Sequence, residues 1–310
     1  MEGIIKAVCI SEKRGTVKKN INEVKVIKDF GLEGDAHAGK WHRQVSFLSA
    51  DIVDEFNEKG ASVIEGDFGE NVLVYGIDFK KLPVGTKLIC NDVKFEVTQI
   101  GKECHSHCEI YKRVGDCIMP REGIFAKVLE GGMIKVGDKI KVIYPDKDMP
   151  YQAAVITLSD KGSRGERVDT SGPKASEILR EHGFEIIEEI LLPDEMAQIK
   201  KELIRLSDSR QVDLIITTGG TGLSPRDCTP EATLAVADRN VPGIAEAIRA
   251  GSMTITKRAM LGVSVTRKKT LIINLPGSKK AVEESLSFII DQLPHGLDTL
   301  RGNTQDCGRN

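Results

Sequence analysis

In the first half of the chain, apolar and polar residues alternate in short runs that Gly, Asp and Asn separate. A period of two places one face of a strand against a core, so these runs predict β-strands. One segment, residues 51–58, has helical spacing instead, with Ser49 as its expected N-cap. The pattern predicts a mainly β, barrel-like domain. Its expected strands are residues 4–10, 24–27, 44–48, 87–89, 94–97 and 140–143.

In the second half, strand-like runs alternate with helical stretches. Runs such as 214–217 and 271–275 are almost wholly apolar, which is typical of strands buried on both faces of a parallel sheet. This order predicts an α/β domain whose largely parallel sheet is covered by helices on both faces. The expected strands are 153–158, 184–192, 214–217 and 271–275, and the expected helices are 173–182, 195–207, 230–237, 244–253 and 279–292.

A proline-containing stretch separates these two patterns. Pro145 and Pro150 lie between two strand-like runs, and proline cannot donate a ladder hydrogen bond. We therefore expect a linker at 145–151, joining a first domain at 1–146 to a second at 151–302, with a frayed end beyond it.

Composition narrows the class of protein. With 310 residues, of which 40% are hydrophobic and 29% charged, the chain has enough apolar residues for two cores. A net charge of −2 leaves no basic excess of the kind that nucleic-acid binding requires. No apolar run approaches the ~20 residues of a membrane helix, and no signal-peptide core is evident, so we expect a cytoplasmic protein without a membrane partner. Seven cysteines, an odd number, argue against a disulfide framework.

The strongest chemical motif is TTGGTGLSPRDCTPEAT at residues 217–233, which follows an apolar strand and opens a helix. Ligands of α/β sheets bind beyond the carboxyl ends of the strands. The glycines allow a sharp turn that brings backbone N–H groups close to an oxyanion, and Thr221 and Ser224 add hydroxyls. The motif is neither a P-loop nor a dinucleotide fingerprint. A plain glycine-rich turn is the structural alternative.

Asp227 lies just beyond these glycines. A phosphate repels a neighbouring carboxylate unless a cation lies between them, and Mg²⁺ held by carboxylates and substrate phosphates is the usual solution. The alternative is a helix cap, for which Thr229 is better placed.

Three further turns follow expected strands. The turn at 276–278 precedes a helix whose N-terminus suits an anion. Asp160 and Asp169 are either metal or ribose ligands or cap and turn residues. Asp194 is most simply a helix N-cap. In a doubly wound sheet all four turns fall on the carboxyl edge, which favours a shared binding site.

These residues resemble the MogA/MoaB family, also found as the G domain of plant and animal molybdenum-insertion proteins. The motif at 217–233 matches, as do LPGSKKA at 275–281 and SDKGSRGERVDTSGP at 159–173. The resemblance covers about 153–300 and implies a three-layer α/β domain, usually trimeric. It also implies Mg²⁺- and ATP-dependent adenylylation of molybdopterin, which gives adenylyl-molybdopterin and pyrophosphate.

The resemblance implies residue roles as well. Asp194 and Asp227 would be the catalytic, Mg²⁺-binding aspartates. The phosphate of molybdopterin would attack ATP directly without a side-chain nucleophile, so Cys228 is expected to fill space. The residues expected to hold the pterin and nucleotide phosphates are Gly219, Gly220, Thr221, Gly222, Ser224, Pro276, Gly277, Ser278, Asp160, Asp169 and Ser171.

A cysteine and histidine cluster marks the first half. Cys104, His105, His107 and Cys108 lie within five residues, and Cys117 follows. Sulfur and imidazole ligands suit zinc, although the usual second ligand pair at a distance is missing. Alternatively, the histidines favour a reactive thiolate, or the cysteines are small buried core residues.

The surroundings of this cluster resemble a MOSC domain over about residues 3–143. The resemblance implies a β-barrel-like fold that binds the molybdenum cofactor or handles sulfur through one cysteine. Cys108 is favoured over Cys104, with Cys117 third. The matching segments are 31–37, 43–46, 66–71, 123–131 and 136–138, together with the cysteine segment.

The two resemblances together predict a two-domain enzyme of molybdenum cofactor biosynthesis. The second half would adenylylate molybdopterin, and the first half would bind the pterin or finished cofactor, or carry sulfur. The expected partners are molybdopterin, ATP and a molybdate-insertion protein or molybdoenzymes, and the expected assembly is a homotrimer. The alternatives are a non-catalytic molybdopterin carrier and a zinc-stabilised scaffold.

Overall fold

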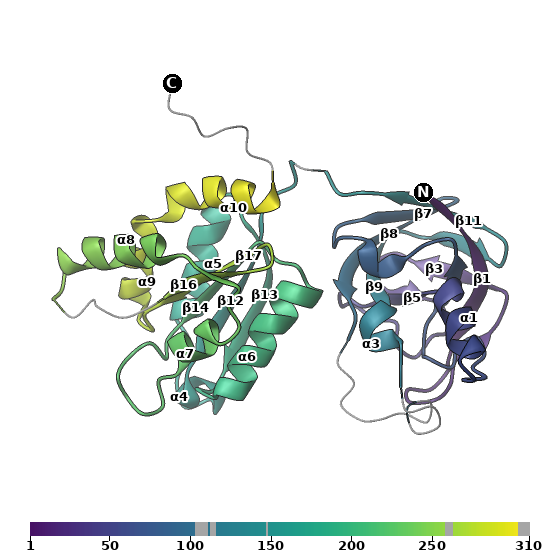
Figure 1. The fold of residues 1–310 in the computed structure, drawn as a ribbon, viewed down its shortest axis with the longest axis horizontal. Helices are drawn as coiled ribbons and strands as arrows, with labels where there is room; N and C mark the ends of the chain where they lie inside the picture. Colours follow the sequence, from purple (N-terminus) through teal and green to yellow (C-terminus); the bar gives the residue numbers. More distant parts are fainter. Residues whose placement is uncertain (103–110, 112–115, 147, 258–262, 303–310) are drawn as a thin grey trace. The chain divides into compact units, whose positions relative to one another are not determined.

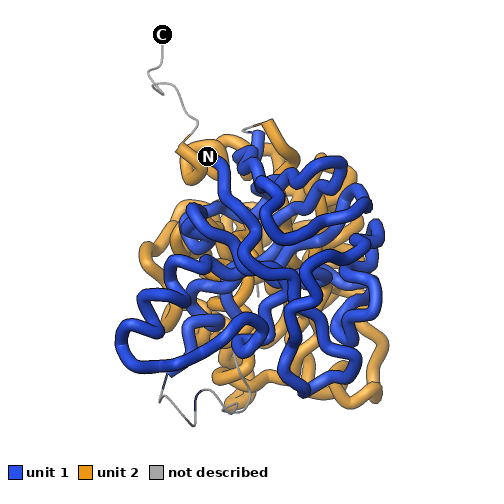
Figure 2. The backbone as a smooth tube through the Cα atoms, turned by 90° about the vertical axis from the view of Figure 1, so that its right-hand side faces the viewer, with its two compact units in different colours: residues 1–146 blue, residues 147–310 orange. Residues whose placement is uncertain are grey.

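The computed structural model of the chain describes residues 1–102, 111, 116–146, 148–257 and 263–302. The chain divides into two compact units, Met1–Asp146 (unit 1) and Lys147–Asn310 (unit 2), shown in Figure 2. Each unit has its own hydrophobic cores. No helix within these described ranges is long and apolar enough to cross a membrane.

Unit 1 is built around a closed barrel (Figure 1). Its strands are β1 (Glu2–Ile10), β5 (Val45–Ser49), β6 (Val72–Tyr75), β7 (Lys87–Cys90), β8 (Val93–Ile100), β9 (Ile124–Glu130) and β11 (Lys139–Ile143). In the described residues the hydrogen-bonded order is β11-β7-β8-β9-β5-β6-β1, and β11 pairs with β1 to close the barrel. Strands β5 and β6 are parallel, whereas the other barrel pairs are antiparallel.

Smaller elements complete unit 1. Strand β2 (Lys19–Asn20) pairs with β1, and a second sheet is formed by β3 (Glu23–Ile27), β4 (Gly31–Leu32) and β10 (Gly132–Lys135). Helices α1 (Ala50–Glu58) and α3 (Met119–Glu122) and the 3₁₀ turn η1 (Phe79–Lys81) lie between barrel strands in the chain. Phe47 packs between Phe95 and Phe79 in the barrel core, at ring-centroid distances of 5.1 and 5.7 Å.

The six strands predicted for the first half all coincide with strands of unit 1. The short strands β2, β4 and β10 were not predicted, and neither were two strands of the barrel, β6 and β9. Both are buried along most of their length, so they lack the alternation that indicates a half-exposed strand. Ser49 directly precedes α1 as expected, yet its side chain makes no capping bond to the helix backbone. Its hydroxyl lies 3.4 Å from Asp51 Oδ2 instead.

The sheet of unit 2 is largely parallel, in agreement with the prediction. Its strands are β12 (Gln152–Leu158), β13 (Glu185–Leu192), β14 (Leu214–Thr218), β15 (Arg239–Asn240), β16 (Ser264–Arg267) and β17 (Thr270–Leu275). The order in the described residues is β13-β12-β14-β17-β16-β15. The first four strands are parallel, β16 pairs antiparallel with β17, and β15 pairs antiparallel with β16.

Helices cover both faces of this sheet (Figure 1). One face packs against α5 (Ser171–Glu181), α8 (Pro242–Met253), α9 (Lys279–Ser287) and α10 (Leu293–Arg301), and the other packs against α6 (Met196–Ile204) and α7 (Thr229–Leu234). Along β12, Val155 faces the first group and Ile156 the second. The central strands β12, β14 and β17 are buried along nearly their whole length, which explains why they are mostly apolar.

Several elements of unit 2 differ from the predicted ones. The helix expected at 195–207 ends at Ile204 and continues as a π turn, η2 (Arg205–Ser209), and the one expected at 279–292 breaks after α9 before the 3₁₀ turn η3 (Ile290–Gln292). A short helix, α4 (Asp160–Ser163), occupies a segment expected to be a loop. Strands β15 and β16 were not predicted because both are short and contain polar residues. Residues 303–310 lie outside the described residues.

Candidate functional site

The four parallel strands of unit 2 end at one edge of the sheet. Leu158 of β12 is paired with Leu192 of β13, and Thr218 of β14 is paired with Leu275 of β17. The loops that follow therefore begin side by side, where α/β folds bind ligands. They enclose a cavity of about 310 Å³. Its lining is Thr157, Leu158, Ser159, Gly162, Arg167, Val168, Asp169, Thr170, Ser171, Asp194, Gly219, Gly220, Thr221, Gly222, Asp227 and Gly277.

The glycine turn after β14 contributes one side of this cavity. Gly219 and Gly220 have φ values of +93° and +61°, in the region that favours glycine. A Cβ on Gly219 would lie 2.3 Å from the Leu158 carbonyl oxygen. Within the described residues, the backbone N–H groups of 220–222 have no protein acceptor. The turn needs glycine for its conformation and its packing, and its amides are available to an anion.

Asp194 connects two of the loops. Its Oδ2 accepts the backbone N–H of Asp160 at 3.0 Å, and Asp160 Oδ1 accepts the N–H of Asp194 at 3.1 Å. The other carboxylate oxygen of Asp194, Oδ1, has no hydrogen-bond partner among the described residues. Burial raises the pKa of Asp194, and the nearby charge of Asp160 adds to that rise. The expected N-cap role is wrong, because Glu195 occupies the cap of α6.

Asp227 forms two hydrogen bonds within its own loop. Its Oδ2 accepts the N–H of Ser224 at 3.0 Å, and its own N–H donates to the Ser224 carbonyl at 2.9 Å. Neither Asp227 nor Thr229 caps α7, because Cys228 occupies the cap without a side-chain bond. Cys228 packs against the hydrophobic cluster beneath α6 and α7, and burial raises the pKa of its thiol. This placement agrees with a packing role.

Asp169 lies one residue before the N-cap of α5, accepts hydrogen bonds from its first turn and also lines the cavity. Its Oδ1 accepts the N–H groups of Ser171 and Gly172 at 2.9 and 3.1 Å, in the first turn of α5. Its Oδ2 accepts the hydroxyl of Thr157 at 2.6 Å. Ser171 Oγ lies 3.0 Å from Thr218 Oγ1, so a hydroxyl network joins the ends of β12 and β14 to α5.

Asn274 of β17 is hydrogen-bonded to residues on both sides of the glycine turn in the sequence. Its Nδ2 donates to Thr217 Oγ1 at 2.8 Å and to Thr233 Oγ1 at 3.0 Å, and all three residues are buried. These bonds tie β17 to β14 and to α7. This contact could not be predicted from the sequence, because an asparagine inside an apolar strand has no local partner that reveals its role.

Some predicted ligand residues lie outside the cavity lining. Ser224, Pro276, Ser278 and Asp160 are absent from it. Ser278 caps α9, because its Oγ accepts the N–H of Ala281 at 3.2 Å. Conversely, the lining includes Arg167, Val168 and Thr170, which were not predicted although they belong to the polar stretch at 159–173.

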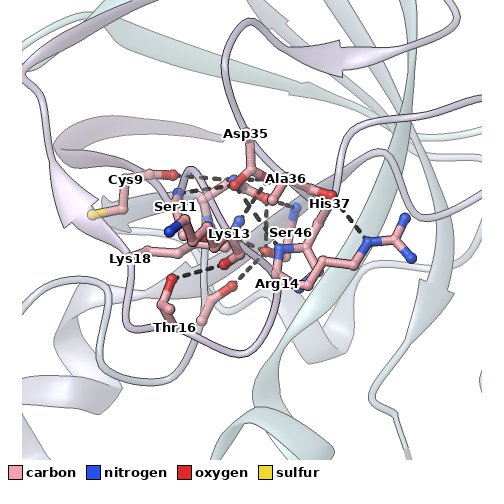
Figure 3. Close-up of polar contacts among 12 residues, drawn as sticks. Cys9, Ser11, Lys13, Arg14, Thr16, Lys18, Asp35, Ala36, His37 and Ser46 are labelled. Atoms are coloured by element: carbon pink, nitrogen blue, oxygen red, sulfur yellow. Dashed lines mark hydrogen bonds and ion pairs between the residues drawn. The ribbon is translucent and has the colours of Figure 1, made fainter.

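In unit 1 the segments of the MOSC resemblance meet in a buried polar cluster (Figure 3). Lys18 Nζ lies 2.6 Å from Asp35 Oδ2, and their side chains are 3% and 0% exposed. Asp35 also accepts the N–H of Ser11 at 3.0 Å and Nδ2 of Asn71 at 3.1 Å. Although burial opposes it, these donors hold the pKa of Asp35 below its usual range. Asn71 in turn bonds Ser46, so three of the segments are joined.

Glu70 is a second buried carboxylate in this region. Its Oε1 accepts the N–H of Gly66 at 2.6 Å, and its Oε2 has no partner among the described residues. Burial raises the pKa of Glu70 to about 7. The MOSC-like motif residues therefore act largely as an internal polar core.

The cysteines of unit 1 are only partly described. Cys104 and Cys108, with His105 and His107, lie outside the described residues. Cys117 is buried in the hydrophobic cluster that also holds Phe56 and Met119. Within the described residues, no group of three or more His, Cys, Asp and Glu side chains could hold a metal ion.

Comparisons with known proteins match both halves. A family model for a probable molybdopterin binding domain matches residues 154–295, and a MOSC domain model matches 34–141. The chain is 39% identical over 153 residues to a molybdopterin adenylyltransferase of Helicobacter pylori, covering 48% of this chain and 87% of that protein. It is 42% identical over 142 residues to one from Escherichia coli, covering 44% and 72%. A solved structure of the molybdopterin biosynthesis enzyme MoaB from Thermus thermophilus is 47% identical, with a TM-score of 0.47, covering 49% of this chain and 97% of that one.

We expect Gly220→Ala to destabilise unit 2 by roughly 2–4 kcal/mol, because φ is +61° and the new Cβ would lie 2.3 Å from Thr229 Oγ1. Gly243→Ala is the matched control, since nothing lies within 4 Å of its Cβ position in α8. Thermal unfolding should show a lower Tm for the first variant and an equal or higher one for the control. Equal Tm values for both variants would contradict the packing argument.

We expect the stability of unit 1 to depend on the ionisation of Glu70. Its pKa is raised to about 7, so between its ordinary pKa of about 4.3 and pH 7 the folded chain binds the extra proton and stability falls as pH rises. Glu70→Gln mimics the neutral form and should raise the unfolding midpoint more at pH 8 than at pH 5. Exposed Glu23→Gln is the control. A pH-independent effect of Glu70→Gln would refute the assignment.

Proposed function

The chain belongs to the family of molybdopterin-binding proteins that includes the molybdopterin adenylyltransferases, and on that basis we propose that unit 2 adenylylates molybdopterin with Mg-ATP. The observation that carries the proposal is the cavity at the carboxyl edge of the sheet. There a glycine turn with unbonded amides lies against Asp194 and close to Asp227. This arrangement suits the joining of two phosphate compounds.

The reaction requires positioning more than a protein nucleophile. A phosphate oxygen of molybdopterin attacks the α-phosphorus of ATP and forms a new P–O–P linkage. The bond from the α-phosphorus to its bridging oxygen breaks, and pyrophosphate leaves with the electron pair. Both reactants are anionic, so the N–H groups of residues 220–222 would hold phosphate oxygens and offset their charge. The protein needs no covalent intermediate.

The acidic residues fit a magnesium ion. Asp194 Oδ1 is buried without a partner, and Asp227 lines the same cavity from the next loop. Hard carboxylate oxygens together with substrate phosphates are the ligands that Mg²⁺ favours. We propose that Asp194 and Asp227 hold this ion, which supplies charge neutralisation at the phosphates when bound.

The size of the cavity limits what it holds. About 310 Å³ is at the lower end of ligand pockets. We infer that the described cavity takes the reacting phosphates, with Gly277, Asp169 and Ser171 around them, while the remaining parts of the substrates extend toward solvent. Unit 2 would act as a homotrimer, as the sequence resemblance implies.

For unit 1 we propose binding of the pterin or finished cofactor, or sulfur transfer, on the strength of the MOSC match at residues 34–141. The polar cluster around Asp35 would stabilise the loops that form such a site. Linking this unit to unit 2 raises the effective concentration of the pterin at each site. A molybdate-insertion protein or a molybdoenzyme would receive the product.

We expect Asp227→Asn to lower adenylyl transfer roughly a hundredfold or more, because it removes a charge that the cation and phosphates require. The full chain would be incubated anaerobically with molybdopterin, ATP and Mg²⁺, and pyrophosphate and adenylylated pterin would be measured by mass spectrometry. Exposed Asp291→Asn is the matched control and should retain wild-type rates. Pterin binding by the wild type without any product would favour the non-catalytic carrier instead.

A further inference from the structure

An arginine bridges three of the loops at the proposed site. Arg226, one residue before Asp227, directs Nε and Nη2 to the two carboxylate oxygens of Asp160, both at 2.9 Å. Its Nη2 also donates to Glu195 Oε1 at 2.8 Å. These residues follow β14, β12 and β13, so the guanidinium joins the loops of three neighbouring strands.

The charge of the cavity is unfavourable for its proposed substrates. The lining contains three aspartates (Asp169, Asp194 and Asp227) against one arginine, Arg167, which gives a formal balance of 1 − 3 = −2. A triphosphate and a pterin phosphate add further negative charge. Arg226 lies beside the cavity, because its chain neighbour Asp227 lines it and its partner Asp160 donates a backbone N–H to Asp194 Oδ2. A second guanidinium would help to offset this repulsion.

The ion pairs of Arg226 with Asp160 and Glu195 are weak enough for another anion to replace the two carboxylates. The arginine side chain is 53% exposed, and Glu195 is 48% exposed, so water competes for both and such pairs contribute little to the stability of a fold. Asp160 retains the N–H of Asp194 as a partner when the arginine leaves. A polyphosphate offers the same planar guanidinium more negative charge than either of these carboxylates does.

We propose that Arg226 is a phosphate-binding residue that exchanges Asp160 and Glu195 for the triphosphate of ATP. This inference rests on the proposed adenylyl transfer and adds to it a residue of unit 2 that selects nucleotides by their phosphates. Asp160 and Glu195 then compete with ATP for the arginine. Weakening that competition should strengthen nucleotide binding, whereas removing the arginine should weaken it.

The test measures equilibrium binding of an ATP analogue with a methylene group between the α- and β-phosphorus atoms, by calorimetry on the full chain with Mg²⁺. We expect Arg226→Gln to weaken binding about tenfold or more and Arg226→Lys to restore part of it. Glu195→Gln should bind the analogue more tightly than the wild type does. Adenosine should bind the wild type and Arg226→Gln with equal affinity. Arg164→Gln, which removes an exposed pair with Glu166, is the control and should stay within about twofold.

Opposite effects of Arg226→Gln and Glu195→Gln distinguish exchange from a purely structural bridge. If both variants weaken the analogue equally, the bridge only holds the loops and the proposal is wrong. If Arg226→Gln binds as the wild type does while the wild type still makes adenylylated pterin, the arginine inference fails and the proposed function stands. If the wild type binds no nucleotide, both the proposed function and the arginine inference are wrong. Tm values of all variants show whether each one folds.

Discussion

The parallel register of β12, β13, β14 and β17 is the constraint on which the candidate site depends. It brings four chain segments, separated by up to about 120 residues in sequence, to one edge of one sheet. The register holds because both faces of β12, β14 and β17 are buried, so a shift of one of these strands by one residue would move each of its side chains to the opposite core. The buried bonds of Asn274 to two threonines fix the same edge from within.

The candidate site at this sheet edge places acidic side chains close to groups that can compensate their charge. Carboxylates from three loops lie near a cavity that we propose for anionic substrates, and the compensating groups that we propose are backbone amides, a magnesium ion and arginines. The glycines allow this arrangement, since side chains at 219 and 220 would collide with Leu158 and Thr229. In unit 1 the opposite charges are buried together. Lys18 and Asp35 neutralise each other inside the protein, where an unpaired charge is costly.

Much of the architecture followed from local pattern, but contacts across the fold did not. The glycine turn could be predicted because glycine, apolar strand and proline signals lie together in 217–233. The bridge from Arg226 to Asp160 spans 66 residues and joins two loops, and no spacing rule indicates it. Asp194 was expected as a helix cap because its sequence position suits one, yet its carboxylate reaches the preceding strand's loop. The short β15 and the largely buried β6 lacked the alternation that marks a strand.

The most direct test of the central claim follows the atoms of ATP through a single turnover. Wild-type protein would be given molybdopterin, Mg²⁺ and ATP labelled at either the α- or the γ-phosphorus. The account predicts that the α label moves to the pterin and that the γ label appears in pyrophosphate. A γ label released as inorganic phosphate, or an α label that remains in nucleotide while the pterin is bound, would contradict adenylyl transfer by this site.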